Sequence, residues 1–346
     1  MHVPFGGAKG GVVCDTKALT ETDLRRITRR YIHELGDNIG PPTDVPAPDL
    51  YTNEQTMAWV YDTYDLMHPG QNNRPVVTGK PLEIGGPAGR LEATGLGCFF
   101  AVKRFLEIAP LPGLERIDGA AIIVQGFGNV GSVAAKSFQD AGAVVLAVSD
   151  SGGGVYNESG LDLEAIAANK AEHGTVVGTP GTRTITNEKL LSLECDILIP
   201  AALGDQIFRG NAAEVKAKLI VEAANRPVTP AADDILMRNG ISVLSDIVAN
   251  AGGVTVSYME WVQNIENEEW DSERINHELQ RKMAGAVDAV IDCWRDLGAR
   301  VATAGEKVGE IRGEPARASS VDLRTAALVL AIRRVARVTL QRGIWP

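Results

Sequence analysis

The 346-residue sequence is poor in cysteine, in aromatic residues and in positive charge. Its four cysteines stand far apart without a CxxC pair, which excludes a disulfide framework and predicts reduced thiols in the cytoplasm, with no metal site. The sequence has 34 basic and 44 acidic residues, for a net charge of −10, so no nucleic-acid partner is expected. No apolar run reaches the roughly 18 residues of a membrane span, and the first residues lack a signal-peptide pattern.

Glycine is abundant, with 37 residues, in an otherwise ordinary globular composition of 45% hydrophobic and 23% charged residues. At about 150 residues per domain, the length corresponds to about two domains. Apolar residues at helical spacing predict four helices, with a capping box at Thr20 and Asp23 before the first. These helices are expected near residues 20–35, 57–67 and 275–297, and from Asp322 to just before Gly343.

From about residue 119, short apolar runs alternate with helical stretches. Runs without polar alternation are typical of strands buried on both faces, as in a parallel sheet. Strands that alternate with helices over this length predict the α/β class and a doubly wound, Rossmann-type dinucleotide-binding domain. The predicted strands are AAIIVQ (120–125), AVVLAVSD (143–150), CDILIP (195–200), LIVEAA (219–224) and ISVLSD (241–246).

The segment GFGNVG (126–131) fits the GxGxxG pattern of dinucleotide-binding turns, and a predicted strand and helix flank it as that site requires. Its glycines permit a tight turn and the close approach of a pyrophosphate to the helix N-terminus. The next strand ends at Asp150, whose carboxylate would accept a ribose hydroxyl and favours NAD, whereas Ser149 would suit a 2′-phosphate. The predicted cofactor is therefore NAD or NADP, with NAD preferred and dual specificity left open. The predicted contacts are Gly126, Phe127, Gly128, Asn129, Val130, Gly131 and Asp150.

Lys9 stands among four glycines in PFGGAKGG (4–11). A lysine on a loop is usually solvated. One held in a cleft would instead have its pKa lowered by desolvation and would serve as a base or an electrostatic catalyst. Asp44, within the proline-stiffened TDVPAPD, is either a turn-forming residue or a proton carrier. Spacing alone decides neither question.

Eight motifs occur in one order: PFGGAKGGV, ITRRY, DVPAPD, VTGKPLEIGG, GRLEATG, VQGFGNVG, EAANRPVTPAA and ANAGGVTVSYMEWVQN. Together they resemble the glutamate dehydrogenases of the amino-acid dehydrogenase family, which also includes leucine, phenylalanine and valine dehydrogenases. The resemblance runs from Val3 to the closing RGIWP. It implies reversible NAD(P)-dependent deamination of L-glutamate to 2-oxoglutarate and ammonia, by an enzyme that forms homo-oligomers, hexamers in the family.

The resemblance also implies roles for single residues. Lys9 matches the lysine that binds substrate and activates the attacking water, and Asp44 matches the aspartate that shuttles a proton to the amino nitrogen. Ser257 matches the serine that binds the side-chain carboxylate of glutamate. The remaining implied contacts are Thr94, Ala201, Asn225 and Asn250 for the cofactor, and Arg90, Asn250 and Val254 for the substrate. Each polar residue among them could instead be satisfied by nearby backbone.

By this resemblance, residues 1–78 form a substrate domain that is truncated at its N-terminus, and residues 79–270 form the dinucleotide-binding domain. Residues 271–346 form helices that pack back on the substrate domain, with a surface excursion or linker at about 299–320. Leu96 replaces an arginine of the family's ATGRG motif. The two lysines with which the family binds the carboxylates of glutamate lie before the equivalent of Lys9, and Lys9 is the first lysine in this sequence. Two alternatives therefore stay open: a leucine-, phenylalanine- or valine-type dehydrogenase, and a truncated, non-catalytic cofactor-binding subunit.

Overall fold

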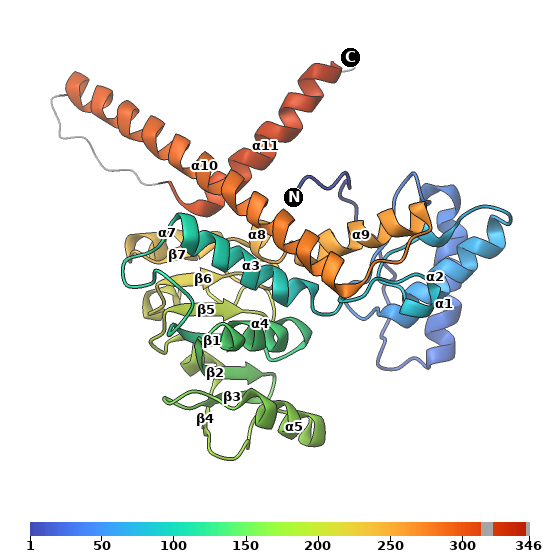
Figure 1. Cartoon of the computed structure of the whole chain (residues 1–346), viewed down its shortest axis with the longest axis horizontal. Coiled ribbons are helices and arrows are strands. Elements are labelled where there is room, and N and C mark those ends of the chain that lie inside the picture. Colours follow the sequence, from blue (N-terminus) through green and yellow to red (C-terminus); the bar gives the residue numbers. More distant parts are fainter. Residues whose placement is uncertain (313–320, 344–346) are drawn as a thin grey trace. The chain divides into compact units, whose positions relative to one another are not determined.

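The computed structural model describes the backbone of residues 1–312 and 321–343, with side chains for 1–304 and 321–343 (Figure 1). The chain forms two compact units. Unit 1 comprises residues 1–93 and 253–279, and unit 2 comprises residues 94–252 and 280–346. The predicted assignment of a substrate domain and a dinucleotide-binding domain is a division by role and stays a prediction. No helix within the described residues is long and apolar enough to span a membrane.

Unit 2 is built on one seven-stranded sheet with the order β4-β3-β2-β1-β5-β6-β7, and Figure 1 shows the strands side by side. Its five parallel strands each lie within a predicted apolar run: β1 (Ala121–Gln125), β2 (Val144–Asp150), β5 (Ile197–Pro200), β6 (Leu219–Val221) and β7 (Ser242–Leu244). The antiparallel strands β3 (Gly153–Tyr156) and β4 (Arg183–Ile185) extend the β2 edge. Neither was predicted, because GGVY and RTI carry no apolar run. The α/β class is confirmed, and the sheet is mixed.

Helices cover both faces of this sheet. Its register places Ile123, Leu198 and Ile220 side by side on one face. There they form a buried cluster with residues of α6 (Asn187–Leu191) and α7 (Pro230–Arg238). Because side chains alternate along a strand, Val124 faces the other way, toward Gly131 of α4 (Asn129–Asp140). The fold is therefore doubly wound, as predicted.

The C-terminal helices differ in part from the prediction. α11 (Leu323–Arg342) begins as expected, because Asp322 caps it by accepting from the amide of Thr325 at 2.7 Å. Residues 299–312, expected as an excursion or linker, instead continue the long helix α10 (Ser272–Arg312). Alanine and glutamate are strong helix formers, which offsets the glycines of this stretch. Residues 313–320 lie outside the described part of the chain. The remaining elements of unit 2 are α3 (Ala93–Ile108), α5 (Leu163–His173), α8 (Asp246–Ala249) and a 3-10 turn at Ala212–Glu214.

Unit 1 contains α1 (Glu21–Leu35), α2 (Glu54–Met67) and α9 (Gly252–Glu266). The predicted capping box is present: the Thr20 hydroxyl accepts from the amide of Asp23, and the Asp23 carboxylate accepts from the amide of Thr20, both at 3.2 Å. Short 3-10 turns lie at Gly36–Asn38, Arg74–Val76 and Leu82–Ile84. α1 and α2 pack together around a small buried core formed by Ile32, Ile39, Met57, Val60, Tyr64, Val76 and Val77.

Candidate functional site

The turn between β1 and α4 has the geometry of a dinucleotide-binding turn. Gly126 adopts a φ of +95°, and a Cβ on it would come within 2.9 Å of the Ala201 backbone. A Cβ on Gly131 would overlap the carbonyl oxygen of Gly126. Gly128, the N-cap of α4, has no side-chain cap, and a Cβ on it would meet no described atom within 4 Å. The first and third glycines therefore serve the fold, whereas the second leaves the helix N-terminus open to a pyrophosphate.

Alanine substitutions are expected to separate folding from cofactor binding at this turn. Gly131→Ala should destabilise unit 2 by about 1–3 kcal/mol, because the added methyl must displace backbone. Gly128→Ala should leave the melting temperature unchanged but weaken dinucleotide binding about tenfold, because the methyl stands where the pyrophosphate approaches. Thermal melts and fluorescence titration with NADH and NADPH measure the two effects. Equal dinucleotide affinity for Gly128→Ala and the unmodified chain would contradict this role of Gly128.

Two further predicted cofactor residues lie beside this turn. Strand order reverses between β1 and β5, and the carboxyl edge at such a switch point is where doubly wound folds bind ligands. Ala201 directly follows β5, and its amide donates to the carbonyl of Gln125 at 2.7 Å. Thr94 lies in the first turn of α3, and a Cβ on its neighbour Gly95 would come within 2.8 Å of the α4 backbone. The sheet and the close packing of these helices thus place both residues near the turn.

Asp150 ends β2, as predicted, but its carboxylate is hydrogen-bonded to the segment that follows α5. One oxygen accepts from the Thr175 hydroxyl at 3.0 Å, and the other accepts from the amide of Val176 at 2.7 Å. Lys170 of α5 donates to the carbonyl oxygen of Phe127 within the glycine turn. The carboxylate that favours NAD is thus partly engaged in structure, and a cation that would suit a 2′-phosphate lies at the same turn.

Two predicted asparagines contact each other at the same edge of unit 2. Asn225 follows β6, and Asn250 directly follows α8. The side-chain amide of Asn250 donates to the side-chain oxygen of Asn225 at 2.8 Å. Asn225 is exposed, so its amide nitrogen is accessible to a ligand. The structure thus brings together two residues that were predicted to contact the cofactor and that stand 25 residues apart in the sequence.

The glycine loop of Lys9 belongs to unit 1 and is attached to α9. Phe5 packs edge-on against Tyr258 and Trp261 of that helix, with ring centroids 5.8 and 6.0 Å apart. The indole nitrogen of Trp261 also donates to the carbonyl of Pro41, at 3.0 Å. α9 therefore supports both the lysine loop and the start of the proline-rich segment that carries Asp44.

Lys9 forms an ion pair with Asp49 and does not lie in a buried site. Its side chain is 83% exposed, so Lys9 is solvated, which is one of the two states that the sequence left open. The Lys9 ammonium, hydrogen-bonded to Asp49, holds the pKa of that carboxyl below its usual value. Asp44 is exposed five residues earlier on the same segment, where its carbonyl accepts from the amide of Gly40 at 3.0 Å. The sequence did not single out Asp49, because only the fold brings it to the lysine.

Arg90 is a largely buried cation with spare hydrogen-bonding capacity. Its Nε is buried and has no hydrogen-bond partner among the described residues. Burial lowers the pKa of the Arg90 guanidinium, and the carboxylate of Glu260 opposes this shift. On α9, Ser257 is 3% exposed and Val254, one turn earlier, is 47% exposed. A buried guanidinium with an unpartnered donor suits a carboxylate ligand.

The sequence analysis missed a buried ion pair in unit 1. The ammonium of Lys80 lies 2.6 Å from a carboxylate oxygen of Glu260, and both side chains are 0% exposed. The other Glu260 oxygen accepts from the amide of Gly79 at 2.6 Å. The two residues stand 180 positions apart in the motifs VTGKPLEIGG and SYMEW, so spacing gave no sign of their contact.

Comparison with known proteins identifies the family. Residues 85–343 match the sequence profile of Glutamate/Leucine/Phenylalanine/Valine dehydrogenase, and residues 1–66 match that of the Glu/Leu/Phe/Val dehydrogenase dimerisation domain. The chain is 47% identical to the glutamate dehydrogenase of Thermotoga maritima, over 100% of this chain and 77% of that protein. The chain belongs to the glutamate/leucine/phenylalanine/valine dehydrogenase family.

Other members of this dehydrogenase family agree in sequence and fold. The NADP-specific glutamate dehydrogenase A1 of Halobacterium salinarum is 43% identical over 99% of this chain and 76% of that protein. The hetero-hexameric glutamate dehydrogenase of Thermus thermophilus, in a leucine-bound crystal structure, aligns with a TM-score of 0.81 and 33% identity. That alignment covers 96% of this chain and 72% of the Thermus chain. The family resemblance inferred from the eight motifs is confirmed.

Proposed function

We propose that the chain catalyses the reversible NAD(P)-dependent oxidative deamination of L-glutamate to 2-oxoglutarate and ammonia. The observation that carries the proposal is 47% identity over the whole chain to a protein named glutamate dehydrogenase. The glycine turn at the switch point supports a dinucleotide, and the unpartnered buried Nε of Arg90 supports a carboxylate substrate. A bound nicotinamide supplies the hydride acceptor for the α-carbon of glutamate.

Unit 2 would bind both the pyrophosphate and the nicotinamide half of the cofactor. The N-terminal amides of α4, left open at Gly128, would bind the pyrophosphate. Asn225 and Asn250, joined by their hydrogen bond, would orient the nicotinamide and its ribose. Thr94 and Ala201 would line the same edge of the sheet.

Unit 1 would supply the proton transfers. Once the hydride has left glutamate, an iminium carbon is open to water, and the Lys9 amine would take the proton that this water loses. For this step Lys9 must be neutral, so it must leave the ion pair with Asp49 for drier surroundings. Asp44 would then deliver a proton to the amino nitrogen. As the C–N bond breaks and ammonia leaves, the Asp44 carboxylate would take up the proton of the adduct's hydroxyl, which becomes the carbonyl of 2-oxoglutarate. Arg90 would pair with a carboxylate of the substrate, and the exposed Val254 would contact its aliphatic part.

The cofactor preference and the assembly are part of the same proposal. Asp150 favours NAD, and the comparison of kcat/KM for NAD and NADP tests whether its carboxylate or the nearby Lys170 dominates. The matched dimerisation profile over residues 1–66, and the hetero-hexameric Thermus relative, support an oligomer, and a homo-oligomer stays the prediction for this chain. The acidic composition and separated cysteines support a cytoplasmic protein whose partners are small molecules, not nucleic acid.

Ser257→Ala is expected to raise KM for glutamate about tenfold, because the buried hydroxyl would donate to the side-chain carboxylate. Turnover of leucine, which has no such carboxylate, should be unchanged by the substitution. Steady-state kinetics with glutamate, leucine and phenylalanine therefore tests both the residue and the substrate class. A strong preference of the unmodified chain for leucine over glutamate would overturn the proposed substrate.

A further inference from the structure

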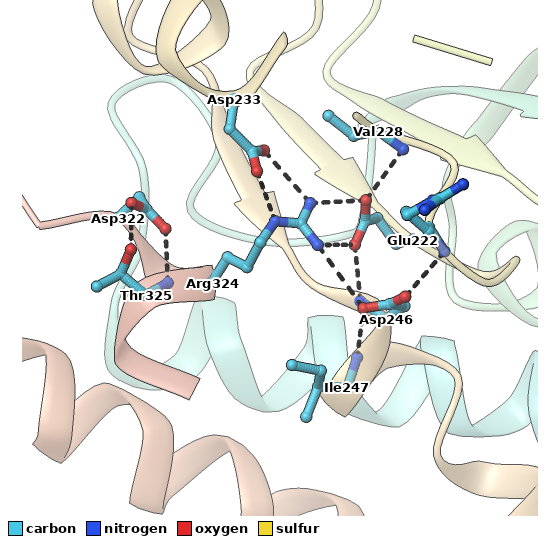
Figure 2. A network of polar contacts seen from close by, with 9 residues as sticks. Glu222, Val228, Asp233, Asp246, Ile247, Asp322, Arg324 and Thr325 are labelled. Carbon is cyan, nitrogen blue, oxygen red and sulfur yellow. Dashed lines mark hydrogen bonds and ion pairs between the residues drawn. The ribbon is translucent and has the colours of Figure 1, made fainter. Parts of the chain in front are cut away.

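Arg324 lies in the first turn of α11 and reaches into a cluster of carboxylates (Figure 2). Its guanidinium donates to the two oxygens of Glu222 at 2.7 and 2.8 Å, and to the two oxygens of Asp233 at 2.6 and 3.3 Å. A third carboxylate, Asp246, lies 3.7 Å away. The Arg324 side chain is 16% exposed and that of Glu222 is fully buried. One planar guanidinium thus joins the end of β6 to α7 and α8.

Glu222 connects Arg324 by hydrogen bonds to the segment 222–228, here called the asparagine loop. Its oxygens accept from the amides of Val228 at 3.2 Å and Asp246 at 2.8 Å. Asp246 in turn accepts from the amide of Arg226 at 2.8 Å. Arg226 has a φ of +48°, a conformation that is costly for a residue with a side chain and persists only where its surroundings fix it. The carboxylate cluster thus helps to fix this loop, together with the loop's other backbone hydrogen bonds and an ion pair of the Arg226 side chain.

The anchored backbone carries both predicted nicotinamide contacts. Asn225 immediately precedes the strained Arg226. Asp246 is the first residue of α8, and Asn250 follows the last. The hydrogen bonds that start at Arg324 thus hold the backbone next to Asn225 and at the start of α8, and the two asparagine side chains are joined to each other by the bond from Asn250 to Asn225.

We propose that Arg324 is a positioning residue that holds the asparagine loop and α8 in the conformation that presents Asn225 and Asn250 to the nicotinamide half of the cofactor. This inference rests on the proposed function, which places these asparagines at the nicotinamide. The contacts of Arg324 lie on β6, α7 and α8, whereas the pyrophosphate turn lies between β1 and α4. Loss of Arg324 should therefore weaken the nicotinamide half of the site selectively.

Electrostatics explains why the hold of Glu222 on the asparagine loop depends on the Arg324 guanidinium. Burial raises the pKa of Glu222, and the hydrogen bonds from Arg324 oppose that shift. Burial likewise raises the pKa of Asp233, again opposed by Arg324. Without the guanidinium, Glu222 would be an uncompensated buried charge facing Asp233 and Asp246, so it must take up a proton or move. Either response loosens its hold on the asparagine loop.

Two ligands distinguish this role from simple anchoring of α11. Arg324→Met, assayed well below its melting temperature, is expected to bind NADH or NADPH about tenfold more weakly. It should bind ADP, or its 2′-phosphate if the chain prefers NADP, as tightly as the unmodified chain, because this ligand lacks both the nicotinamide and its ribose. Arg333→Met is the matched control, since Arg333 lies on the same helix, 47% exposed and 3.5 Å from Asp296. That control should change neither affinity.

Each outcome of these titrations decides a question. If Arg324→Met binds the dinucleotide as tightly as Arg333→Met does, or loses both ligands equally, the positioning role is wrong. If the unmodified chain binds neither ligand, the proposed function falls and the inference falls with it. If Arg324→Met does not fold, Arg324→Lys carries the test. Lysine keeps the positive charge but lacks the planar, forked donors of the guanidinium. We therefore expect the affinity for the dinucleotide alone to fall, by about threefold.

Discussion

Lys9→Met is expected to lower kcat for glutamate deamination by about 10²–10⁴-fold while leaving dinucleotide affinity unchanged. The magnitude is that of a lost general acid–base step. Binding should persist because the turn that holds the pyrophosphate belongs to unit 2, whereas Lys9 belongs to unit 1. Steady-state rates and a fluorescence titration with NADH or NADPH measure the two quantities on the same preparation.

Lys17→Met is the matched control for this substitution, because Lys17 is also an exposed lysine of the N-terminal segment. It should retain the full rate. If Lys9→Met were as active as Lys17→Met, the exposed ion pair with Asp49 would be the whole role of Lys9, and the proposed mechanism would be wrong.

Lys80→Met is expected to lower the free energy of unfolding by about 3–5 kcal/mol, the usual cost of removing one partner from a buried ion pair. Lys80 lies 2.6 Å from Glu260, and both side chains are fully buried. The variant therefore leaves a carboxylate without its cation in the interior of unit 1. Denaturant unfolding of the variant and the unmodified chain measures the difference.

The pH dependence of this loss has a definite sign. Burial raises the pKa of Glu260, and the Lys80 ammonium opposes the shift, so removing Lys80 raises that pKa further. The native variant then binds a proton more tightly than the unfolded chain, whose carboxyl has a pKa of about 4.3. Stability from this protonation is present at low pH and is lost as pH rises through the folded pKa. The destabilisation should therefore be largest at neutral pH and shrink on acidification.

Two controls complete the test of the buried pair. Lys80→Met combined with Glu260→Leu should recover most of the lost stability, because an apolar pair leaves no charge buried. Lys136→Met removes an exposed ion pair with Asp140, 2.8 Å away on α4, and should change stability little. A Lys80→Met variant as stable as Lys136→Met would show that the buried pair contributes nothing.

The sequence alone sufficed for features that depend on local pattern. Apolar runs marked the five parallel strands, because most of their side chains are buried or half-buried, and the glycine spacing marked the turn at residues 126–131. The strands β3 and β4 escaped prediction, because GGVY and RTI carry no apolar period. β3 is held by pairing with β2, and β4 by pairing with β3. Residues 299–312 were expected to belong to an excursion or linker, because residues 299–320 are rich in alanine, glycine and glutamate and include Pro315, yet they continue α10.

Contacts between residues far apart in the chain could not be predicted from the sequence. Lys9 with Asp49, Lys80 with Glu260 and Arg324 with Glu222 each join charges whose separation follows no helical or strand period. Charged residues are mostly solvated, so nothing in their identity marked these as paired. Where the sequence did indicate site residues, it relied on the motifs shared with the family, and the individual roles stay predictions.

Transfer of deuterium from the α-carbon of glutamate to the cofactor tests the central claim most directly. The purified chain is incubated with L-glutamate deuterated at the α-carbon and with NAD or NADP, and the products are analysed by mass spectrometry. The account predicts one deuterium on the nicotinamide ring for each 2-oxoglutarate released. A chain that binds the dinucleotide yet yields neither deuterated nicotinamide nor 2-oxoglutarate would contradict it.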